Sequence, residues 1–330
     1  MPAMRDPSPV LLVALPRDPE VDAAIGEILP GVPWAYLDLT RSADYGSVRA
    51  MLAESLRTGF AGFDARATPN LRFVQQVSTG LDRFPFEWFP STVEVAGNVG
   101  GFAPYVAEHA LMLALAAGRD LHTAESMVEA GRLRPPPHGR SLIDASAVIL
   151  GYGAIGRAIA ERLAPFGARV IGLNRAGAPA ESAVEMLPAS RLREAVGAGS
   201  FVFEARPLTR ATAGSIGAAE FRAMRPDAVF VNVGRAGTVD QRALYEHLRT
   251  HPEFRAAFDV WWGEDYVDGA ISTEYPLARL PNFYGTPHSA DTFAASDRRA
   301  LRMALENVAR FFRVGHPRFI VDRREYEPPR

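Results

Sequence analysis

The sequence predicts an α/β protein with doubly wound parallel sheets, divided into two domains. Its 330 residues exceed the roughly 250 to 300 at which a single hydrophobic core usually stops growing. Short apolar runs alternate with helical patterns through the second half of the chain, as in parallel sheets whose strands are joined by crossover helices. Early in that alternation, an apolar run meets three glycines, Gly151, Gly153 and Gly156, and a helical segment follows.

The composition excludes several classes of function. A content of 48% hydrophobic and 22% charged residues is typical of a soluble globular protein, and a net charge of −2 argues against electrostatic binding of nucleic acid. The chain has no cysteine, which excludes disulfides and thiolate chemistry and suits a reducing cytoplasm. All 36 basic residues are arginine, so Schiff-base chemistry on lysine is excluded as well. We expect neither a signal peptide nor a membrane span.

The first hundred residues have the pattern of a smaller α/β domain. We expect strands at 10–15, 71–77 and 93–96, and helices at 21–29 and 47–57. A helix from Pro104 to Ala117 is long enough to bridge two domains, and a long amphipathic helix from Phe293 to Phe312 should return the chain to the first. The expected domains are therefore 1–100 plus 291–330, and 101–290.

The three glycines predict a turn that binds the pyrophosphate of a dinucleotide. Gly151 allows a sharp turn, Gly153 lets the backbone approach the pyrophosphate, and Gly156 lets the helix pack closely on the strand. The N–H groups of Ala154 and Ile155 lie at the start of the helix, where the free amides and the helix dipole favour an anion. The spacing alone arises easily in a chain with 28 glycines, but a second apolar strand completes a βαβ unit.

Three polar residues follow expected strands of the second domain. Arg235 comes after a strand at 228–233, Glu264 after a strand at 256–260, and His288 after a short apolar run. Ligands of open α/β sheets bind beyond the carboxyl ends of the strands, so these residues can converge beside the nicotinamide end of the dinucleotide. Taken singly, each also has an ordinary interpretation, as a loop charge, a surface carboxylate or a structural loop histidine.

Several motifs occur in a fixed order from about Leu71 to the C-terminal helix. They are Ser78-Thr-Gly-Leu-Asp82, Val106-Ala-Glu-His109, Gly151-Tyr-Gly-Ala-Ile-Gly156, Pro207-Leu-Thr209, Val231-Asn-Val-Gly-Arg-Ala-Gly-Thr-Val-Asp240, Phe258-Asp-Val260 and Thr286-Pro-His288. With this set the sequence resembles the D-isomer-specific 2-hydroxyacid dehydrogenases. The resemblance implies two Rossmann-like domains, with the dinucleotide domain inserted in a smaller flavodoxin-like substrate domain, and a homodimer formed through the dinucleotide domain.

The resemblance also implies a reaction and its catalytic residues. A small 2-oxo acid similar to glyoxylate or hydroxypyruvate would be reduced to the D-2-hydroxy acid by hydride from NAD(P)H. Arg235 would bind the substrate carboxylate and carbonyl oxygen, because a guanidinium suits both. His288 would donate the proton, and Glu264 would pair with it and favour its charged form.

Further binding residues come from the same resemblance. Backbone amides at Thr79 and Gly80 would hold the substrate carboxylate from the other domain. Asp259 would contact the nicotinamide carboxamide, and Pro207, Thr212 and Val233 would contribute to the cofactor site. The other histidines, including His109, have no partner at ligand spacing and receive no role. No zinc set or serine-nucleophile elbow is present in the sequence.

The sequence departs from the family where the adenosine ribose would lie. The acidic residue that binds the ribose hydroxyls of NAD is absent, and the chain has Asn174 and Arg175 there. Arg206 lies where the family usually has a small or neutral residue, so two arginines could clasp a 2′-phosphate, and NADP is favoured over NAD. Trp261 and Trp262 are bulkier than the common pattern and could close the substrate pocket or fill a core or an interface.

A second class of function is compatible with the same residues. Transcriptional corepressors that resemble these dehydrogenases use the fold to sense nucleotides, and fold alone does not determine function. The presence of Arg235, Glu264 and His288 favours an enzyme, although such corepressors can keep the three residues. The alternative is therefore a nucleotide-sensing interaction protein.

Overall fold

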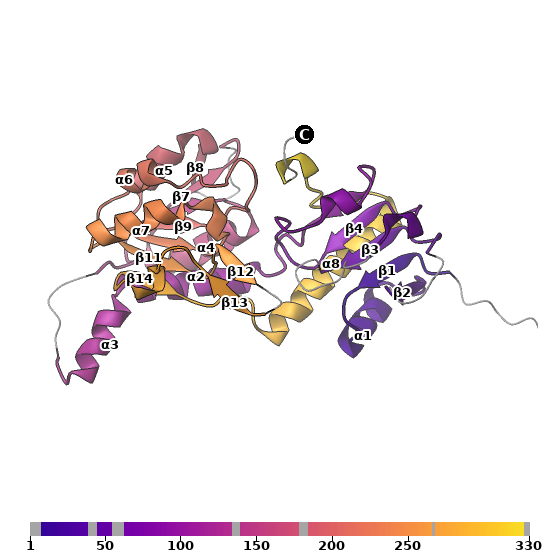
Figure 1. Ribbon diagram of the computed structural model, residues 1–330, viewed down its shortest axis with the longest axis horizontal. Helices are drawn as coiled ribbons and strands as arrows, with labels where there is room; N and C mark the ends of the chain where they lie inside the picture. The colour runs from indigo at the N-terminus through magenta and orange to yellow at the C-terminus, as the bar shows by residue number, and fades with distance from the viewer. Residues whose placement is uncertain are drawn as a thin grey trace, which may run out of the picture. The chain divides into compact units, whose positions relative to one another are not determined.

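The computed structural model describes residues 8–38, 45–54, 63–133, 139–177, 184–265 and 268–326. The chain forms two compact units, each with its own parallel sheet (Figure 1). Unit 1 comprises Met1–Phe102 and Thr292–Arg330, and unit 2 comprises Ala103–Asp291. The expected α/β class with parallel sheets is confirmed.

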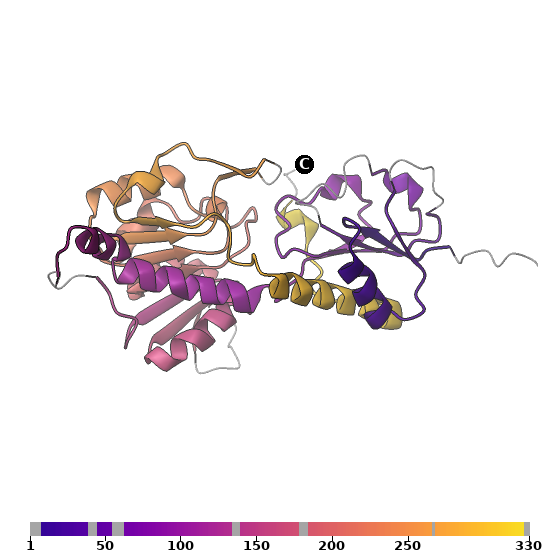
Figure 2. The ribbon, with the colours of Figure 1, turned by 90° about the horizontal axis from the view of Figure 1, so that it is seen from below.

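Unit 1 is a five-stranded parallel sheet in the order β2-β1-β3-β4-β5. Its strands are β1 (Leu11–Ala14), β2 (Trp34–Tyr36), β3 (Ala50–Ala53), β4 (Phe73–Gln76) and β5 (Glu94–Ala96). The helices α1 (Pro19–Ile28) and α8 (Ala294–Val314) pack on one face, together with Leu11 and Val13 (Figures 1 and 2). The intervening residue Leu12 faces the opposite side, because successive side chains of a strand alternate.

The helix expected at 47–57 is wrong, because Ala50–Ala53 form strand β3. Alanine, methionine and leucine favour helices when no tertiary contact opposes them. Here the four residues are fully buried and pair in parallel with β1 on one side and β4 on the other. A continuous apolar run is also what a strand covered on both faces requires, so pairing overrides propensity.

Unit 2 is a seven-stranded parallel sheet in the order β14-β11-β10-β9-β6-β7-β8. Its strands are β6 (Ser146–Leu150), β7 (Arg169–Asn174), β8 (Glu185–Pro188), β9 (Phe201–Glu204), β10 (Val229–Asn232), β11 (Arg255–Phe258) and β14 (Phe283–Gly285). The first half of the order runs from β6 to β8 and the second from β9 to β14. The order reverses between β6 and β9, which makes their carboxyl ends the switch point at which such sheets bind ligands.

Helices cover both faces of this second sheet. Helix α2 (Ala103–Gly118) packs against α4 (Ala154–Leu163) and against β10 and β11 (Figure 2). The helices α5 (Leu192–Ala198), α6 (Ala218–Ala223) and α7 (Gln241–Thr250) pack side by side on the opposite face (Figure 1). Helix α3 (Leu121–Glu129) and a ribbon of β12 (Gly263–Asp265) and β13 (Ala270–Ser272) complete the unit.

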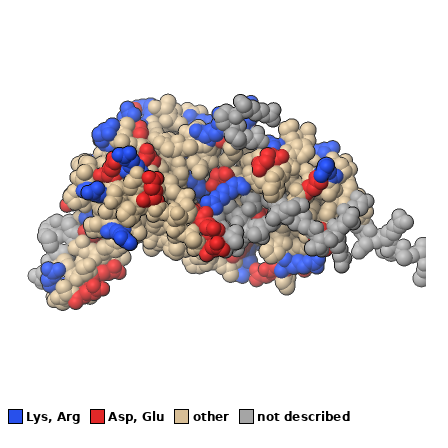
Figure 3. Space-filling model, viewed as in Figure 1, with Lys and Arg blue, Asp and Glu red and all other residues tan. Residues whose placement is uncertain are grey.

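The surface shows no large field of one charge on the face seen in Figure 3. Arginine and acidic side chains lie next to one another there. Within the part of the chain that the structure describes, no helix has both the length and the apolar character needed to cross a membrane.

Candidate active site

The turn between β6 and α4 has the geometry that its three glycines predict. Gly151 adopts φ +94°, in the left-handed region that favours glycine. A Cβ on Gly156 would lie 2.4 Å from the carbonyl oxygen of Gly151, so the helix can pack this closely only without a side chain. A Cβ on Gly153, which caps α4, would meet no atom within 4 Å. The turn therefore leaves open space beside Gly153, where Ala154 and Ile155 begin the helix.

Asn174 and Arg175, at the end of β7, have different surroundings. The side chain of Asn174 accepts a hydrogen bond from the backbone N–H of Ala176 at 3.1 Å, which closes a tight turn. Arg175, the next residue, is exposed. Arg175 therefore lies at the surface beside the end of β7.

Arg206 is paired with the buried carboxylate of Glu204, which belongs to none of the motifs in the sequence. Glu204 is the last residue of β9 and is completely buried. Its carboxylate accepts hydrogen bonds from the backbone N–H and the Nε of Arg206, at 2.8 and 3.0 Å, and forms an ion pair with the guanidinium. The Cγ of Arg206 lies 2.9 Å from the position of a Cβ on Gly151, so the ion pair lies against the glycine turn at the switch point.

The loop after β9 is closed by its own side chains. The hydroxyl of Thr212 donates to the carbonyl oxygen of Pro207 at 2.6 Å and accepts from the N–H of Thr209 at 2.8 Å. Val233 is buried and donates its N–H to the carbonyl oxygen of Glu204 at 3.1 Å. These residues therefore hold the backbone beside the switch point.

His288 and Glu264 are in direct contact. The Nδ1 of His288 lies 2.8 Å from Oε1 of Glu264, and the same oxygen accepts the backbone N–H of Trp261 at 2.8 Å. The Glu264 side chain is only 8% exposed, against 24% for His288. A histidine paired with a nearly buried carboxylate can take up and release a proton without losing its orientation.

Arg235 follows β10 at the same edge of the sheet. Its carbonyl oxygen accepts hydrogen bonds from the side chains of Asn232 and Thr238, at 3.1 and 2.8 Å. Its guanidinium donates to the carbonyl oxygen of Gly234 at 3.0 Å. The backbone that presents this arginine is therefore fixed on both sides.

Asp259 lies beneath the loop that carries His288. It is 1% exposed and accepts the hydroxyl hydrogen of Thr286 at 2.7 Å and the N–H groups of Ser289 and Ala290 at 2.9 and 3.1 Å. His109, to which the sequence assigned no role, lies with its Nε2 2.9 Å from the Oγ1 of Thr286. No spacing in the sequence could have revealed this contact, because it joins helix α2 to a loop 177 residues further along the chain.

Comparison with known proteins identifies the family. The family model described as the NAD binding domain of D-isomer specific 2-hydroxyacid dehydrogenase matches residues 111–290, more than half of the 330 residues. This chain belongs to the D-isomer-specific 2-hydroxyacid dehydrogenase family. It is an oxidoreductase, and its cofactor is a nicotinamide dinucleotide, NAD or NADP.

Relatives and solved structures of similar sequence agree that the chain belongs to this family. A glyoxylate reductase of Korarchaeum cryptofilum is 31% identical over 265 residues, which are 78% of this chain and 77% of the relative. The structure of an NADPH-dependent glyoxylate/hydroxypyruvate reductase from Sinorhizobium meliloti, in complex with NADP and sulfate, has 26% identity and a TM-score of 0.79 over 96% of this chain and 99% of its own. A Pyrobaculum aerophilum protein, provisionally described as a formate dehydrogenase, has 30% identity and a TM-score of 0.80 over the same shares.

The two tryptophans of the dehydrogenase are built into unit 2. The indole N–H of Trp261 donates to the carbonyl oxygen of Thr286, and that of Trp262 to the carbonyl oxygen of Val239, both at 2.9 Å. Trp261 belongs to the hydrophobic core and packs across Gly285, where a Cβ would lie 2.8 Å from its ring. Trp261 therefore fills part of the core, and Trp262 is partly buried against it.

Thr79 and Gly80 belong to unit 1 and directly follow the turn after β4. The hydroxyl of Thr79 donates to the carbonyl oxygen of Asn98 at 3.1 Å. The buried side chain of Asn98 in turn donates to the carbonyl oxygens of Val77 and Ala300, both at 2.8 Å. The loop at the carboxyl end of β4 is therefore tied to α8 within the same unit.

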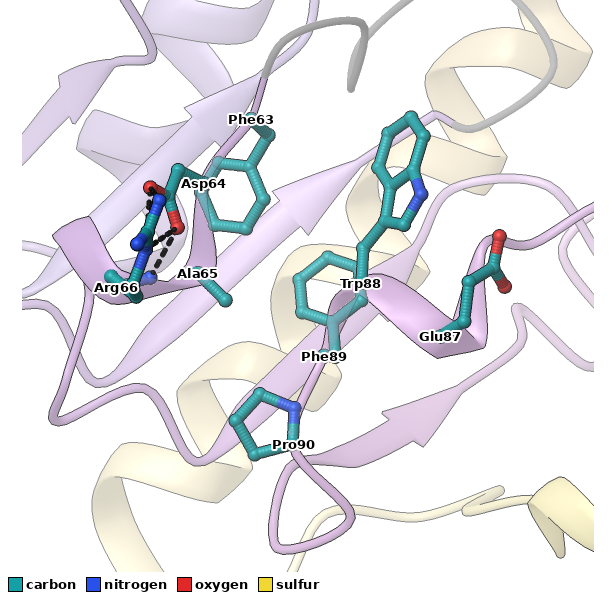
Figure 4. A pocket seen from close by; sticks show the side chains of 8 residues that line it. All are labelled: Phe63, Asp64, Ala65, Arg66, Glu87, Trp88, Phe89 and Pro90. Carbon is teal, nitrogen blue, oxygen red and sulfur yellow. Dashed lines mark hydrogen bonds and ion pairs between the residues drawn. The ribbon is translucent and has the colours of Figure 1, made fainter.

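A hollow of about 600 Å³ on unit 1 contains none of the predicted site residues (Figure 4). Phe63 and Phe89 are stacked on one side of it, with ring centres 5.4 Å apart, and belong to the packing under the sheet. The charges of Asp64 and Arg66 in its wall are paired with each other. We assign no ligand to this hollow.

The glycine turn generates a matched pair of predictions. Gly153→Ala should fold with an unchanged melting temperature, because its Cβ meets open space, yet bind NADPH at least about tenfold more weakly if a pyrophosphate approaches there. Gly156→Ala should lower the melting temperature, because its Cβ would collide with the Gly151 carbonyl. Thermal unfolding and fluorescence titration with NADPH measure both effects. Normal NADPH affinity in Gly153→Ala would show that the pyrophosphate binds elsewhere.

Proposed function

We propose that this dehydrogenase reduces a small 2-oxo acid, such as glyoxylate or hydroxypyruvate, to the D-2-hydroxy acid with NADPH. The observation that carries the proposal is the contact between His288 and Glu264 at the edge of the sheet that also bears the glycine turn. A proton donor and a dinucleotide turn on one edge are what hydride transfer to a carbonyl requires. The open space at Gly153 fits a pyrophosphate.

In the proposed mechanism, each residue has one task. The guanidinium of Arg235 binds the substrate carboxylate and stabilises the negative charge that grows on the carbonyl oxygen. His288 gives a proton to that oxygen, and Glu264 holds the imidazole in position. When bound, the nicotinamide supplies the hydride that adds to C2 of the substrate.

The other assignments extend the same proposal. In this proposal the backbone amides of Thr79 and Gly80 bind a carboxylate, and unit 1 has the role of substrate domain. Unit 2 is the dinucleotide domain, in which Pro207, Thr212 and Val233 line the cofactor site.

We propose that Arg175 recognises the 2′-phosphate of NADP. It is exposed at the end of β7, where NAD-specific relatives of this fold carry an acidic residue instead. Arg206 is paired with the buried carboxylate of Glu204, so its charge is already compensated within the protein. The ion pair therefore supports the part of the site that NADH and NADPH share.

A homodimer formed through unit 2 is part of the proposal. Exposed apolar side chains of unit 2 support it, namely those of Leu121 and Val128 on α3 and of Leu133 and Ile143 later in the chain. The cysteine-free chain and the use of NADPH suit the cytoplasm, which we propose as its compartment. Sedimentation of the purified protein tests the dimer, and a monomer at micromolar concentration would contradict it. Cell fractionation tests the compartment.

The alternative function, a nucleotide-sensing corepressor, has no support among the relatives reported above, which carry enzyme names. The decisive test is the oxidation of NADPH in the presence of 2-oxo acids. The proposal predicts turnover of glyoxylate or hydroxypyruvate by the wild-type protein. Tight NADPH binding without turnover of any 2-oxo acid would reject it.

The role of His288 generates a prediction of its own. His288→Ala should lower kcat by at least about a hundredfold, because general acid catalysis contributes 10²–10⁴ to such rates, while the Kd of NADPH stays within threefold. Steady-state kinetics and fluorescence titration measure the two quantities. His316→Ala, at an exposed residue of unit 1, is the control and should keep full activity. A His288→Ala enzyme of near-normal rate would refute the assignment.

The two arginines should respond differently to removal. Arg175→Ala should weaken NADPH by about 10- to 100-fold and leave NADH unchanged, because it removes a charge-assisted hydrogen bond to the 2′-phosphate alone. Arg206→Ala should weaken both nucleotides alike, because it leaves Glu204 buried without its partner. Titration with each nucleotide measures the ratio, and the double variant Glu204→Gln with Arg206→Ala controls for misfolding. An unchanged NADPH/NADH ratio in Arg175→Ala would overturn the phosphate assignment.

A further inference from the structure

The loop that carries His288 is held from below by a single carboxylate. Oδ1 of Asp259 accepts hydrogen bonds from the Thr286 hydroxyl and the Ser289 N–H, and Oδ2 accepts from the Ala290 N–H. These donors come from both sides of His288 in the sequence. A carboxylate that is 1% exposed needs such donors to offset the loss of water, so the loop and Asp259 stabilise each other.

His288 needs this support because its backbone is strained. Its φ is +53°, in the left-handed region that is unfavourable for a residue with a side chain. Such a conformation persists only where the surrounding structure holds it. The bonds from Asp259 to residues on both sides of His288 hold it in place, and they thereby direct the imidazole to Glu264, 2.8 Å away.

The hydrogen bonds around His109 determine which of its ring nitrogens carries the hydrogen. Burial raises the pKa of Asp259, but hydrogen bonds from His109, Ser289 and Thr286 outweigh burial and hold that pKa below its usual value. Asp259 is therefore a carboxylate that can only accept, and the one hydroxyl hydrogen of Thr286 points to it. The Thr286 oxygen must then accept from His109, so the hydrogen of His109 lies on Nε2, which is also 3.3 Å from Oδ1 of Asp259.

We propose that His109 is a positioning residue for catalysis. From helix α2, its Nε2–H holds the Thr286 hydroxyl and the Asp259 carboxylate in the arrangement that keeps His288 left-handed and against Glu264. The residue acts through this network and does not itself contact the substrate. The inference rests on the proposed function for its effect on rate, but the network itself is testable without turnover.

The kinetic test compares variants that remove or keep the N–H donor. His109→Ala should lower the single-turnover rate of hydride transfer at least tenfold, with the Kd of NADPH within threefold. His109→Gln, whose amide N–H reaches a similar position, should restore much of that rate. Thr286→Val should reproduce the loss and Thr286→Ser should not. The double variant His109→Ala with Thr286→Val should lose less than the product of the single losses, because both remove one network.

Equal losses in His109→Ala and His109→Gln, or a near-normal rate in His109→Ala, would overturn the proposal. A structural readout separates this from failure of the proposed function. In ¹⁵N NMR of the wild-type protein, the His109 ring should show its hydrogen on Nε2, and in a crystal structure of His109→Ala the backbone of His288 should leave the left-handed region. A ring that carries its only hydrogen on Nδ1, or an unchanged His288 backbone, would reject the network even if the enzyme turned over 2-oxo acids.

Discussion

The parallel pairing of β6 with β7 on one side and β9 on the other is the constraint on which the site depends. It reverses the strand order at β6, so the connections that follow β6 and β9 run to opposite faces of the sheet, which is where such sheets bind ligands. Leu150 and Glu204 are paired in this register, which brings the residues just after them, the glycine turn and Arg206, into contact. The close packing of α4 at Gly156 then keeps the turn at the switch point.

Buried carboxylates give this edge of the sheet its chemistry. The side chains of Glu204, Asp259 and Glu264 are all less than a tenth exposed. Glu204 is bound by the guanidinium of Arg206, and Glu264 by the imidazole of His288. Asp259 is bound by the hydroxyl of Thr286 and the imidazole of His109. Because an unpaired buried charge is costly, each carboxylate fixes its partner as firmly as the partner fixes it. The imidazole of His288 and the guanidinium of Arg206 are therefore held in position by these carboxylates.

The sequence predicted much of this site, for a local reason. A strand, a glycine turn and a helix are contiguous, and residues that follow parallel strands must lie at one edge, so Gly151, Arg235 and His288 could be placed at one edge of the sheet from their positions. Their roles in the predicted site came from the family resemblance. It did not predict β3, because four apolar residues have the same pattern in a helix and in a buried strand. It also did not predict that Glu204 is buried and paired with Arg206, because nothing in the neighbouring sequence indicates that a glutamate is buried.

By itself, then, the sequence determined the α/β class, and it predicted the dinucleotide turn and the strand ends at which Arg235, Glu264 and His288 lie. Periodicity and strand ends are properties of neighbouring residues, so they can be found without the structure. Only the tertiary structure decided which side chains meet. His109 contacts Thr286, which lies 177 residues further along the chain, and Trp261 packs on Gly285. Arg206 forms an ion pair with Glu204 beside the glycine turn. Such contacts depend on how helices and strands pack in three dimensions, and packing joins residues that no local pattern connects.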